Sequence, residues 1–315
     1  MSKKITVIGA GSVGATVTYT LSVMGVADEI VMIDINETKV LGEALDIRQG
    51  LPFCGTRSVY AGSYAEAENS DMVIITSGLP RKPGQTRLEL AQVNVDILKG
   101  IMPKITKYAP DAIYLLVANP VDILTYTFVR YSGIPENRVF GSGTMLDSVR
   151  LRARLAEYYD IDSKYITAYA LGEHGDSMFV PWSIMSINGI GTRLYKEKCE
   201  EKGSMMPAID RAEIEKYVRT SGGRVIARKG ATYYAVSMSV AHMCRCVLEN
   251  FGTVLPVSVM MHGEHGVSDV CLSYPTMLNC NGVQTKIPTP LSAEEEVLLR
   301  RSADALKSVI SGLAF

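Results

Sequence analysis

Three spaced glycines near the N-terminus, Gly9-Ala-Gly11-Ser-Val-Gly14, constrain the fold of this chain more than any other feature. They follow a β-branched stretch, residues 5–8, and open a helix-like stretch, residues 12–24. A glycine-rich turn between a strand and a helix lets backbone N–H groups approach a pyrophosphate, which the helix N-terminus also attracts. The sequence therefore predicts a dinucleotide site whose contacts are Gly9, Gly11, Ser12, Val13 and Gly14.

An acidic residue ends the second predicted strand, residues 29–35. Asp34 lies 20 residues after Gly14. A carboxylate at this place accepts hydrogen bonds from ribose hydroxyls and repels a 2′-phosphate. An ordinary loop with a surface aspartate is the alternative interpretation. Strand, glycines, helix and acid together favour NAD over NADP.

Strands and helices alternate as far as residue 142. Predicted strands cover residues 72–76, 112–118 and 138–140, and predicted helices cover residues 88–107, with a kink at Pro103, and 121–131. Continuous apolar strands that alternate with helices form a parallel sheet covered on both faces. We expect an α/β fold in which residues 1–142 form a Rossmann-type, doubly wound, NAD-binding domain.

The pattern changes after residue 142, which predicts a second, α+β domain for catalysis and substrate binding over residues 143–315. Its predicted elements are a helix (148–159), strands near 165–171 and 179–187, and a loop or exposed helix end (193–202). Next come a helical region (211–250) with breaks at Gly222-Gly223 and Gly230, strands (254–261 and 269–277), and a last helix that opens with a capping box at Ser292.

Composition excludes several other classes of protein. The 315 residues are 47% hydrophobic and carry a net charge of -1, which gives no indication of nucleic-acid or membrane-surface binding. No apolar run approaches the roughly 18 residues of a membrane span. The six cysteines form no dense framework and are expected to be reduced thiols in a cytoplasmic protein.

One histidine has partners for proton transfer elsewhere in the sequence. His174 follows an apolar stretch and stands between glycines in Leu171-Gly-Glu-His-Gly-Asp176. A lone histidine is more often structural, but Asp147 provides a carboxylate that can orient the ring and stabilise the imidazolium. Arg150 lies one helical turn after Asp147, and a planar guanidinium is the natural bidentate partner of a substrate carboxylate.

Two further polar segments follow strands of the first half. The basic segment Arg81-Lys-Pro-Gly-Gln-Thr-Arg87 comes after the third strand of the chain order, where a lid over the cofactor would lie; a solvated surface loop is the alternative. Asn119-Pro120 ends the next strand at the same sheet edge, where doubly wound folds bind their ligands.

Two histidine-containing segments resemble metal sites, but we expect no metal. Flanking glycines make His262-Gly-Glu-His265 a turn. His242 and Cys244 are two residues apart on a predicted helix, where side chains do not face each other. Neither segment has third and fourth ligands at a suitable spacing.

Taken together, these segments resemble the L-lactate/malate dehydrogenase family over nearly the whole chain. The resemblance is carried by Gly9–Gly14, Ala118-Asn-Pro-Val-Asp122, Gly141–Arg150, Gly172–Asp176 and Lys229-Gly-Ala-Thr-Tyr-Tyr234. The lactate branch is the most similar, also through Pro181-Trp-Ser183. The resemblance implies hydride transfer between NADH and C2 of a small 2-keto acid, with pyruvate and L-lactate as the expected pair, and self-association as a homotetramer or dimer.

The resemblance also assigns a role to each site residue. His174, held by Asp147, would give a proton to the keto oxygen and act as the base in reverse. Arg150 would anchor the carboxylate, and Arg87, carried in by loop closure, would polarise the carbonyl. Asn119 would contact both the substrate and the cofactor. Thr232 would line the pocket for the substrate's side chain.

Arg81 departs from the lactate pattern. Lactate enzymes of this family usually have glutamine there, and malate enzymes have arginine. An arginine closed over a methyl group lacks an anionic partner, and an unpaired buried charge costs about 3–5 kcal/mol. Malate dehydrogenase activity on a lactate-type scaffold is therefore the alternative, unless Arg81 turns toward solvent. An alternative of another class is a non-catalytic NAD sensor, which needs the glycine loop and Asp34 but not His174.

Overall fold

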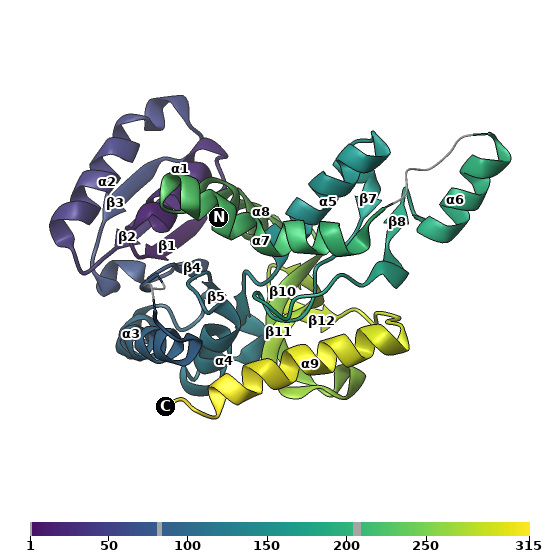
Figure 1. Ribbon diagram of the computed structural model, residues 1–315. Coiled ribbons are helices and arrows are strands. Elements are labelled where there is room, and N and C mark those ends of the chain that lie inside the picture. The colour runs from purple at the N-terminus through teal and green to yellow at the C-terminus, as the bar shows by residue number, and fades with distance from the viewer. Residues whose placement is uncertain (1, 81–83, 204–208) are drawn as a thin grey trace.

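The computed structural model describes residues 2–80, 84–203 and 209–315 (Figure 1). In this part of the chain a nine-stranded sheet has the order β12-β11-β10-β6-β5-β4-β1-β2-β3. Its parallel half consists of β1 (Lys4–Ile8), β2 (Glu29–Ile33), β3 (Ser58–Ala61), β4 (Met72–Ile75), β5 (Ile113–Leu116) and β6 (Val139–Gly141). β1, the first strand, lies between β2 and β4, so the strand order reverses there and the predicted doubly wound sheet is confirmed.

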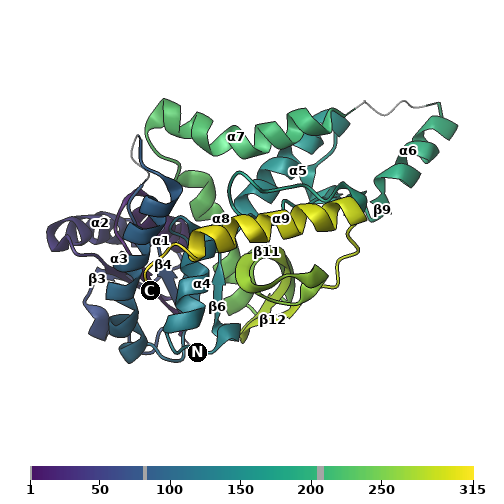
Figure 2. The same ribbon diagram turned by 60° about the horizontal axis from the view of Figure 1, so that its bottom comes forward.

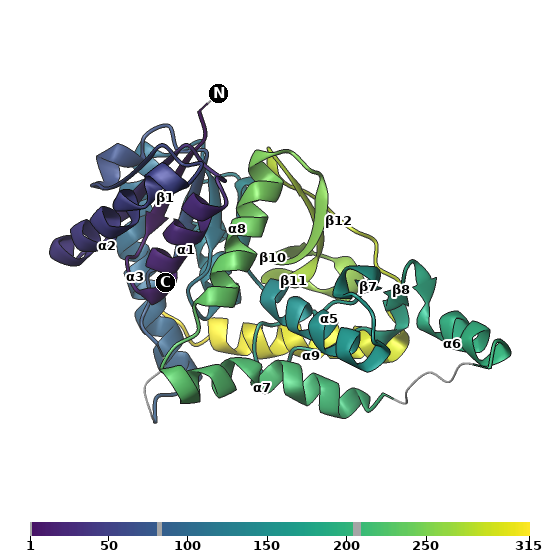
Figure 3. The same ribbon diagram turned by 90° about the horizontal axis from the view of Figure 1, so that it is seen from above.

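Helices cover both faces of this sheet (Figures 1 and 3). One face packs with α1 (Ser12–Val23), α2 (Glu37–Gln49) and α8 (Tyr234–Leu248). The other face packs with α3 (Arg87–Tyr108), α4 (Val121–Tyr131) and α9 (Ala293–Ile310). The strands between them are apolar and buried, which is the pattern of a parallel sheet with two covered faces.

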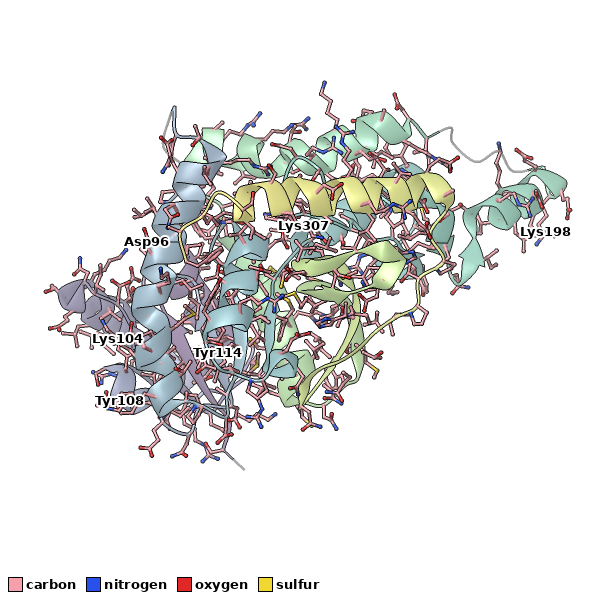
Figure 4. The ribbon with its side chains drawn as sticks, turned by 90° about the horizontal axis from the view of Figure 1, so that it is seen from below. Asp96, Lys104, Tyr108, Tyr114, Lys198 and Lys307 are labelled. Carbon is pink, nitrogen blue, oxygen red and sulfur yellow. The ribbon has the colours of Figure 1, made fainter. Side chains whose placement is uncertain are left out.

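Tyr114 shows how the second face is filled. It is a fully buried side chain of β5, and Figure 4 shows it inside the molecule near α3 and α4. Its ring centroid is 4.6 Å from that of Phe128 on α4. Its hydroxyl donates to the carbonyl of Ala109 at 2.8 Å, so the one polar atom of this large side chain is satisfied.

The second half of the chain extends the same sheet. β10 (Thr253–His262), β11 (Ser268–Asn279) and β12 (Gly282–Lys286) are antiparallel, and β10 joins β6 where Ser258 lies opposite Gly141. The remaining elements are a small sheet of β7 (Ile166–Thr167), β8 (Ser186–Ile187) and β9 (Ile190–Gly191), and the helices α5 (Met145–Tyr159), α6 (Thr192–Glu201) and α7 (Arg211–Lys229). The capping box predicted at Ser292 is present at the start of α9.

Two expectations for the second half were wrong, and a third was decided between its two alternatives. The apolar stretches 165–171 and 179–187 contain only short strands, because their side chains are buried against helices rather than arranged along a sheet. Residues 193–202 are almost entirely helical, in α6, where i,i+4 pairs such as Lys196–Glu200 support an exposed helix. Figures 1 and 2 show α6 projecting from the body, and Figure 4 places Lys198 there.

The predicted helix break at Gly222-Gly223 was the second error. α7 runs through both glycines without interruption. A glycine inside a helix costs roughly 0.5–1 kcal/mol relative to alanine, but it keeps its backbone hydrogen bonds, so the helix continues. The break predicted at Gly230 is confirmed, because this residue, with a φ of +82°, ends α7.

No helix in the described ranges is long and apolar enough to cross a membrane.

Candidate active site

The glycine turn has the shape that a dinucleotide requires. Gly9 has a φ of +105°, which makes the sharp turn after β1. A Cβ on Gly14 would lie 1.8 Å from the carbonyl oxygen of Gly9, so only glycine lets α1 approach the strand this closely. A Cβ on Gly11 would meet nothing within 4 Å. The open space at Gly11, beside the N-terminus of α1, fits a pyrophosphate group.

Asp34 lies at the end of β2, beside this turn. Its two carboxylate oxygens accept the backbone N–H groups of Ala10 at 2.6 Å and of Asn36 at 2.9 Å. Each oxygen keeps a further lone pair for a ribose hydroxyl. Asp34 thus braces the glycine turn and places a negative charge where a 2′-phosphate would have to fit.

A cavity of about 570 Å³ connects the glycine turn with the predicted catalytic residues. It is large enough for the reactive end of a dinucleotide and a small acid. The sequence-predicted residues that line it are Gly11, Ser12, Val13, Gly14, Asn119, Asp147, Arg150, His174 and Thr232. Gly9, Asp34 and Arg87 are not among the residues that line the cavity.

Asp147 connects the side chains of His174 and Arg150. One of its oxygens lies 2.6 Å from Nδ1 of His174, and the other accepts a hydrogen bond from Nη1 of Arg150 at 2.9 Å. The Asp147 side chain is 5% exposed, whereas that of His174 is 30% exposed. Asp147 and Arg150 project from the first two turns of α5, and His174 lies on the loop after β7. Because Nδ1 faces the carboxylate, Nε2 is the ring nitrogen left for a substrate in the cavity.

The electrostatics of this pair favour a protonated imidazole. Burial disfavours the charged form of His174, but the negative charge and the hydrogen bond of Asp147 outweigh it and raise the pKa of His174 to about 9. For Asp147, burial favours the neutral form, yet the charges of His174 and Arg150 hold its pKa below the usual value. At neutral pH the ring therefore carries a proton that it can donate.

Asn119 lies in the cavity wall, three residues after the end of β5. Its peptide bond to Pro120 is cis. The buried Asn94 of α3 donates to the carbonyl of Asn119 at 2.7 Å and also bonds to the backbone of Leu79 on the neighbouring loop. These bonds hold the two loops that follow β4 and β5 in a fixed relation at the carboxyl edge of the sheet.

Arg87 is the first residue of α3, between Thr86 and Glu89, which form the capping box of this helix. Its guanidinium forms an ion pair with Glu173, whose side chain is 7% exposed, and lies 4.0 Å from Asp176. It is thus held beside the His174 loop rather than in the cavity. Arg81, the residue that separates the lactate and malate patterns, lies outside the described residues.

Several cavity residues were missed by sequence reasoning. Thr76 and Gly78 follow β4, Ser142 follows β6, and α7 contributes Arg219, Gly222 and Gly223. The first three follow strand ends at the same sheet edge, and this was the available signal. The α7 residues gave no signal, because only the fold places that helix over Arg150.

The histidine segments set aside as metal sites have other partners. His262 lies 2.6 Å from a carboxylate oxygen of Glu136, and His265 lies 3.0 Å from one of Glu296. Among the residues that the structure describes, no group of three or more His, Cys, Asp or Glu side chains is arranged to hold a metal ion.

Comparisons with known proteins agree with this geometry. The NAD-binding domain model of lactate/malate dehydrogenases matches residues 3–141, and the model of their α/β C-terminal domain matches residues 144–314. An L-lactate dehydrogenase of a Thermoanaerobacter species is 45% identical over 310 residues, covering 98% of this chain and 99% of the relative. That of Acetivibrio thermocellus is 42% identical over 311 residues, covering 99% and 97%.

A solved structure extends the agreement to the fold. The minor L-lactate dehydrogenase of Enterococcus mundtii, in a ligand-bound form, superposes with a TM-score of 0.93 at 36% identity and covers 98% of both chains. Full-length similarity at this level, together with matches to both domain models, leaves one conclusion. The chain belongs to the lactate/malate dehydrogenase family.

Proposed function

We propose that this protein is an L-lactate dehydrogenase that interconverts pyruvate and L-lactate with NADH and NAD. The observation that carries the proposal is the arrangement of His174, Asp147 and Arg150 around one cavity. It combines a proton donor, the carboxylate that keeps it charged, and a guanidinium for a substrate carboxylate. Relatives that bear the name L-lactate dehydrogenase over their full length support the choice of pyruvate.

The chain's own residues perform binding and proton transfer. Arg150 binds the carboxylate of pyruvate through paired N–H donors in the plane of its guanidinium. Asn119 holds the keto group near Nε2 of His174, and Thr232 lines the space for the methyl group. Bound NADH supplies the hydride that C2 of pyruvate accepts. His174 donates its proton from Nε2 to the keto oxygen, and Asp147 stabilises the imidazolium before this transfer. In lactate oxidation the neutral ring takes the hydroxyl proton.

Arg87 is proposed to polarise the keto carbonyl. A cation near the keto oxygen stabilises the negative charge that develops there. In the present structure Glu173 holds this guanidinium, so polarisation requires the Arg87 side chain to leave Glu173. An Arg87→Gln variant is expected to lose kcat with little change in NADH affinity.

The two halves of the chain divide the work in this proposal. Residues 1–142 bind NAD, and residues 143–315 provide His174, Asp147 and Arg150. This division is supported by the domain models that match residues 3–141 and 144–314, although the sheet itself continues across the boundary through β6 and β10.

Asp34 is expected to make NADH the preferred cofactor. kcat/KM for NADH should exceed that for NADPH, because the carboxylate repels the 2′-phosphate. Asp34→Asn keeps an oxygen for the N–H of Ala10 but removes the charge, so it should lower the ratio of kcat/KM for NADH to that for NADPH. Steady-state rates with both cofactors measure this ratio. Equal kcat/KM values for the two cofactors in the wild type contradict the role of Asp34.

Oxaloacetate is the competing substrate because of Arg81. The deciding experiment compares kcat/KM for pyruvate and oxaloacetate on one preparation, each with NADH. The proposal expects a clear preference for pyruvate, and Arg81→Gln should increase it. A preference for oxaloacetate in the wild type, lost in Arg81→Gln, would identify a malate dehydrogenase. NAD binding without turnover of either acid would identify a non-catalytic sensor.

We also propose self-association, as a homotetramer or a dimer. Large apolar side chains are exposed on adjoining elements of one side of the Rossmann half: Tyr19 and Val23 on α1, Leu41 and Leu45 on α2, Tyr234 and Met238 on α8. Exposed apolar surface of this kind marks interaction sites. A measured mass of two or four times 34.3 kDa supports assembly, and the mass of one chain contradicts it.

The free thiols fit a cytoplasmic location of the protein. Cell fractionation followed by detection of the protein tests this location.

A further inference from the structure

A second buried carboxylate lies behind His174. Asp122 is in the first turn of α4 and is 2% exposed. One oxygen accepts the backbone N–H of His174 at 2.7 Å, and the other accepts the hydroxyl of Ser258 on β10 at 2.6 Å. Both distances are those of charge-assisted hydrogen bonds. Among the described residues, no lysine or arginine forms an ion pair with Asp122, so its charge is not explained by a partner cation.

An uncompensated buried carboxylate is costly to the fold. Burial raises the pKa of Asp122 to about 6, against the opposing hydrogen bonds of Ser258 and His174, so the group is still ionised at neutral pH. An asparagine of the same shape could accept the N–H of His174 without placing a charge in the interior. The charge itself therefore needs a use, and the imidazolium of His174 is the cation among the described residues that acts electrostatically on Asp122.

We propose that Asp122 is a positioning residue for proton transfer, which fixes the backbone of His174 and places a second negative charge behind the imidazolium. Asp147 acts on the ring through Nδ1, whereas Asp122 acts from the backbone side. The inference rests on the proposed acid/base role of His174 and extends it to a residue on a different element.

The position of Asp122 in the fold allows it to connect several segments of the site. It lies three residues after Asn119, the residue at the cavity wall. Its other partner, Ser258, is the residue of β10 that lies opposite Gly141 of β6. The chain passes from Gly141 directly into α5, which carries Asp147. The Asp122 carboxylate thereby links the segments that carry Asn119, His174 and Asp147.

Other ionisable groups also face this pair, so the test must separate their effects. Asp147 and Asp122 both raise the pKa of His174, while Arg150 on α5 lowers it. The described groups that face Asp122 besides His174 are Glu173 on the same loop, itself paired with Arg87 of α3, and Cys271 on β11. Replacing Asp122 alone changes none of those side chains.

The experiment is a proton NMR titration of the histidine rings in the cofactor-free, full-length chain. The chain has four histidines, so single His→Gln variants of the other three assign the His174 signals. In Asp122→Asn the pKa of His174 is expected to fall by about half a unit to one unit, the effect of a nearby negative charge that is removed. kcat for pyruvate reduction should fall by about tenfold with little change in the KM for pyruvate, because Arg150 is untouched.

Ser258→Ala is the matched control. It removes the hydrogen bond between Asp122 and Ser258 and leaves the bond to His174. In a titration above pH 7, His174 should therefore show its wild-type pKa. A purely structural role for Asp122 predicts the same His174 pKa in Asp122→Asn as in the wild type. A change of less than about 0.2 pKa units in Asp122→Asn therefore overturns the proposal, whatever happens to kcat.

The wild-type titration decides the matter if Asp122→Asn does not fold. Protonation of Asp122 should then move the His174 ring signals in a separate step with a midpoint near pH 6. Absence of any such step between pH 7 and pH 5 overturns the proposal. The titration requires no substrate, so its result stands apart from the proposed function: a protein that fails to reduce pyruvate can still show or lack the effect.

Discussion

The His174→Ala variant is expected to lose about 10³-fold in kcat for pyruvate reduction, within the 10²–10⁴ range typical of general acid–base catalysis. The loss falls on kcat because the ring supplies the proton for the keto oxygen, and Nε2 has no substitute donor in the alanine variant. NADH binding should be unchanged, since the glycine turn lies at the other end of the cavity. Stopped-flow single turnovers and NADH fluorescence measure the two quantities.

His262→Gln is the matched control for this variant. His262 is exposed, ends β10 and pairs with Glu136, away from the cavity lining. The His262→Gln variant should retain the wild-type kcat. Near-normal kcat in His174→Ala would contradict the acid/base role and would leave the cavity without an assigned proton donor.

The second large effect is expected for Arg150→Lys, with a loss of about 10²–10³-fold in kcat/KM for pyruvate, mainly through KM. Lysine keeps the charge but lacks the planar fork that binds a carboxylate at two points. Breaking a buried, hydrogen-bonded charge pair costs about 2–5 kcal/mol, which corresponds to roughly 30-fold to 5,000-fold and includes the expected loss. Steady-state kinetics with pyruvate as the varied substrate measure the effect.

Arg154→Lys provides the comparison on the same helix. Arg154 lies one turn further along α5 and pairs with Glu157 and Glu213 instead of Asp147. Its replacement should leave the KM for pyruvate unchanged. An Arg150→Lys variant with a wild-type KM would show that the substrate carboxylate binds elsewhere.

Local sequence patterns were sufficient for the cofactor half of the site. The glycine turn and Asp34 could be predicted because their roles depend on a strand, a turn and a helix that follow one another in the chain. The doubly wound sheet was predictable for the same reason, since each strand of this half is a short apolar run followed by a helix.

The connections between distant segments could not be predicted in this way. The bond between His174 and Asp122 joins positions 52 residues apart, and the ion pair of Arg87 with Glu173 joins positions 86 apart. Nothing near Asp122 in the sequence indicates a charge that faces a histidine. The extension of the sheet by β10 likewise depends on a single pair, Ser258 and Gly141, which brings the two halves together.

Composition gave little information on secondary structure in the second half. The charged stretch 193–202 left a loop and an exposed helix end open, and ion pairs at helical spacing stabilise the helix α6. Gly222 and Gly223 were interpreted as breaks, although neither has a φ that a helix cannot accommodate. In both cases composition was weighed more heavily than spacing.

The shifted pKa of His174 also links the site to stability. Its pKa in the folded protein, about 9, lies above its ordinary value of 6.5. Folding therefore favours the protonated ring. This contribution to stability is fully present below pH 6.5 and is lost as the pH rises through about 9, because the unfolded chain releases the proton first.

The central claim is that His174, held by Asp147, is the acid of pyruvate reduction and the base of L-lactate oxidation. The most direct test is the pH dependence of kcat/KM for both directions in the wild type and in Asp147→Asn. The account predicts that reduction falls, and oxidation rises, as the pH passes through about 9, and that Asp147→Asn moves both midpoints toward 6.5. Midpoints that are the same in the two proteins, or two directions that change together with pH, would contradict it.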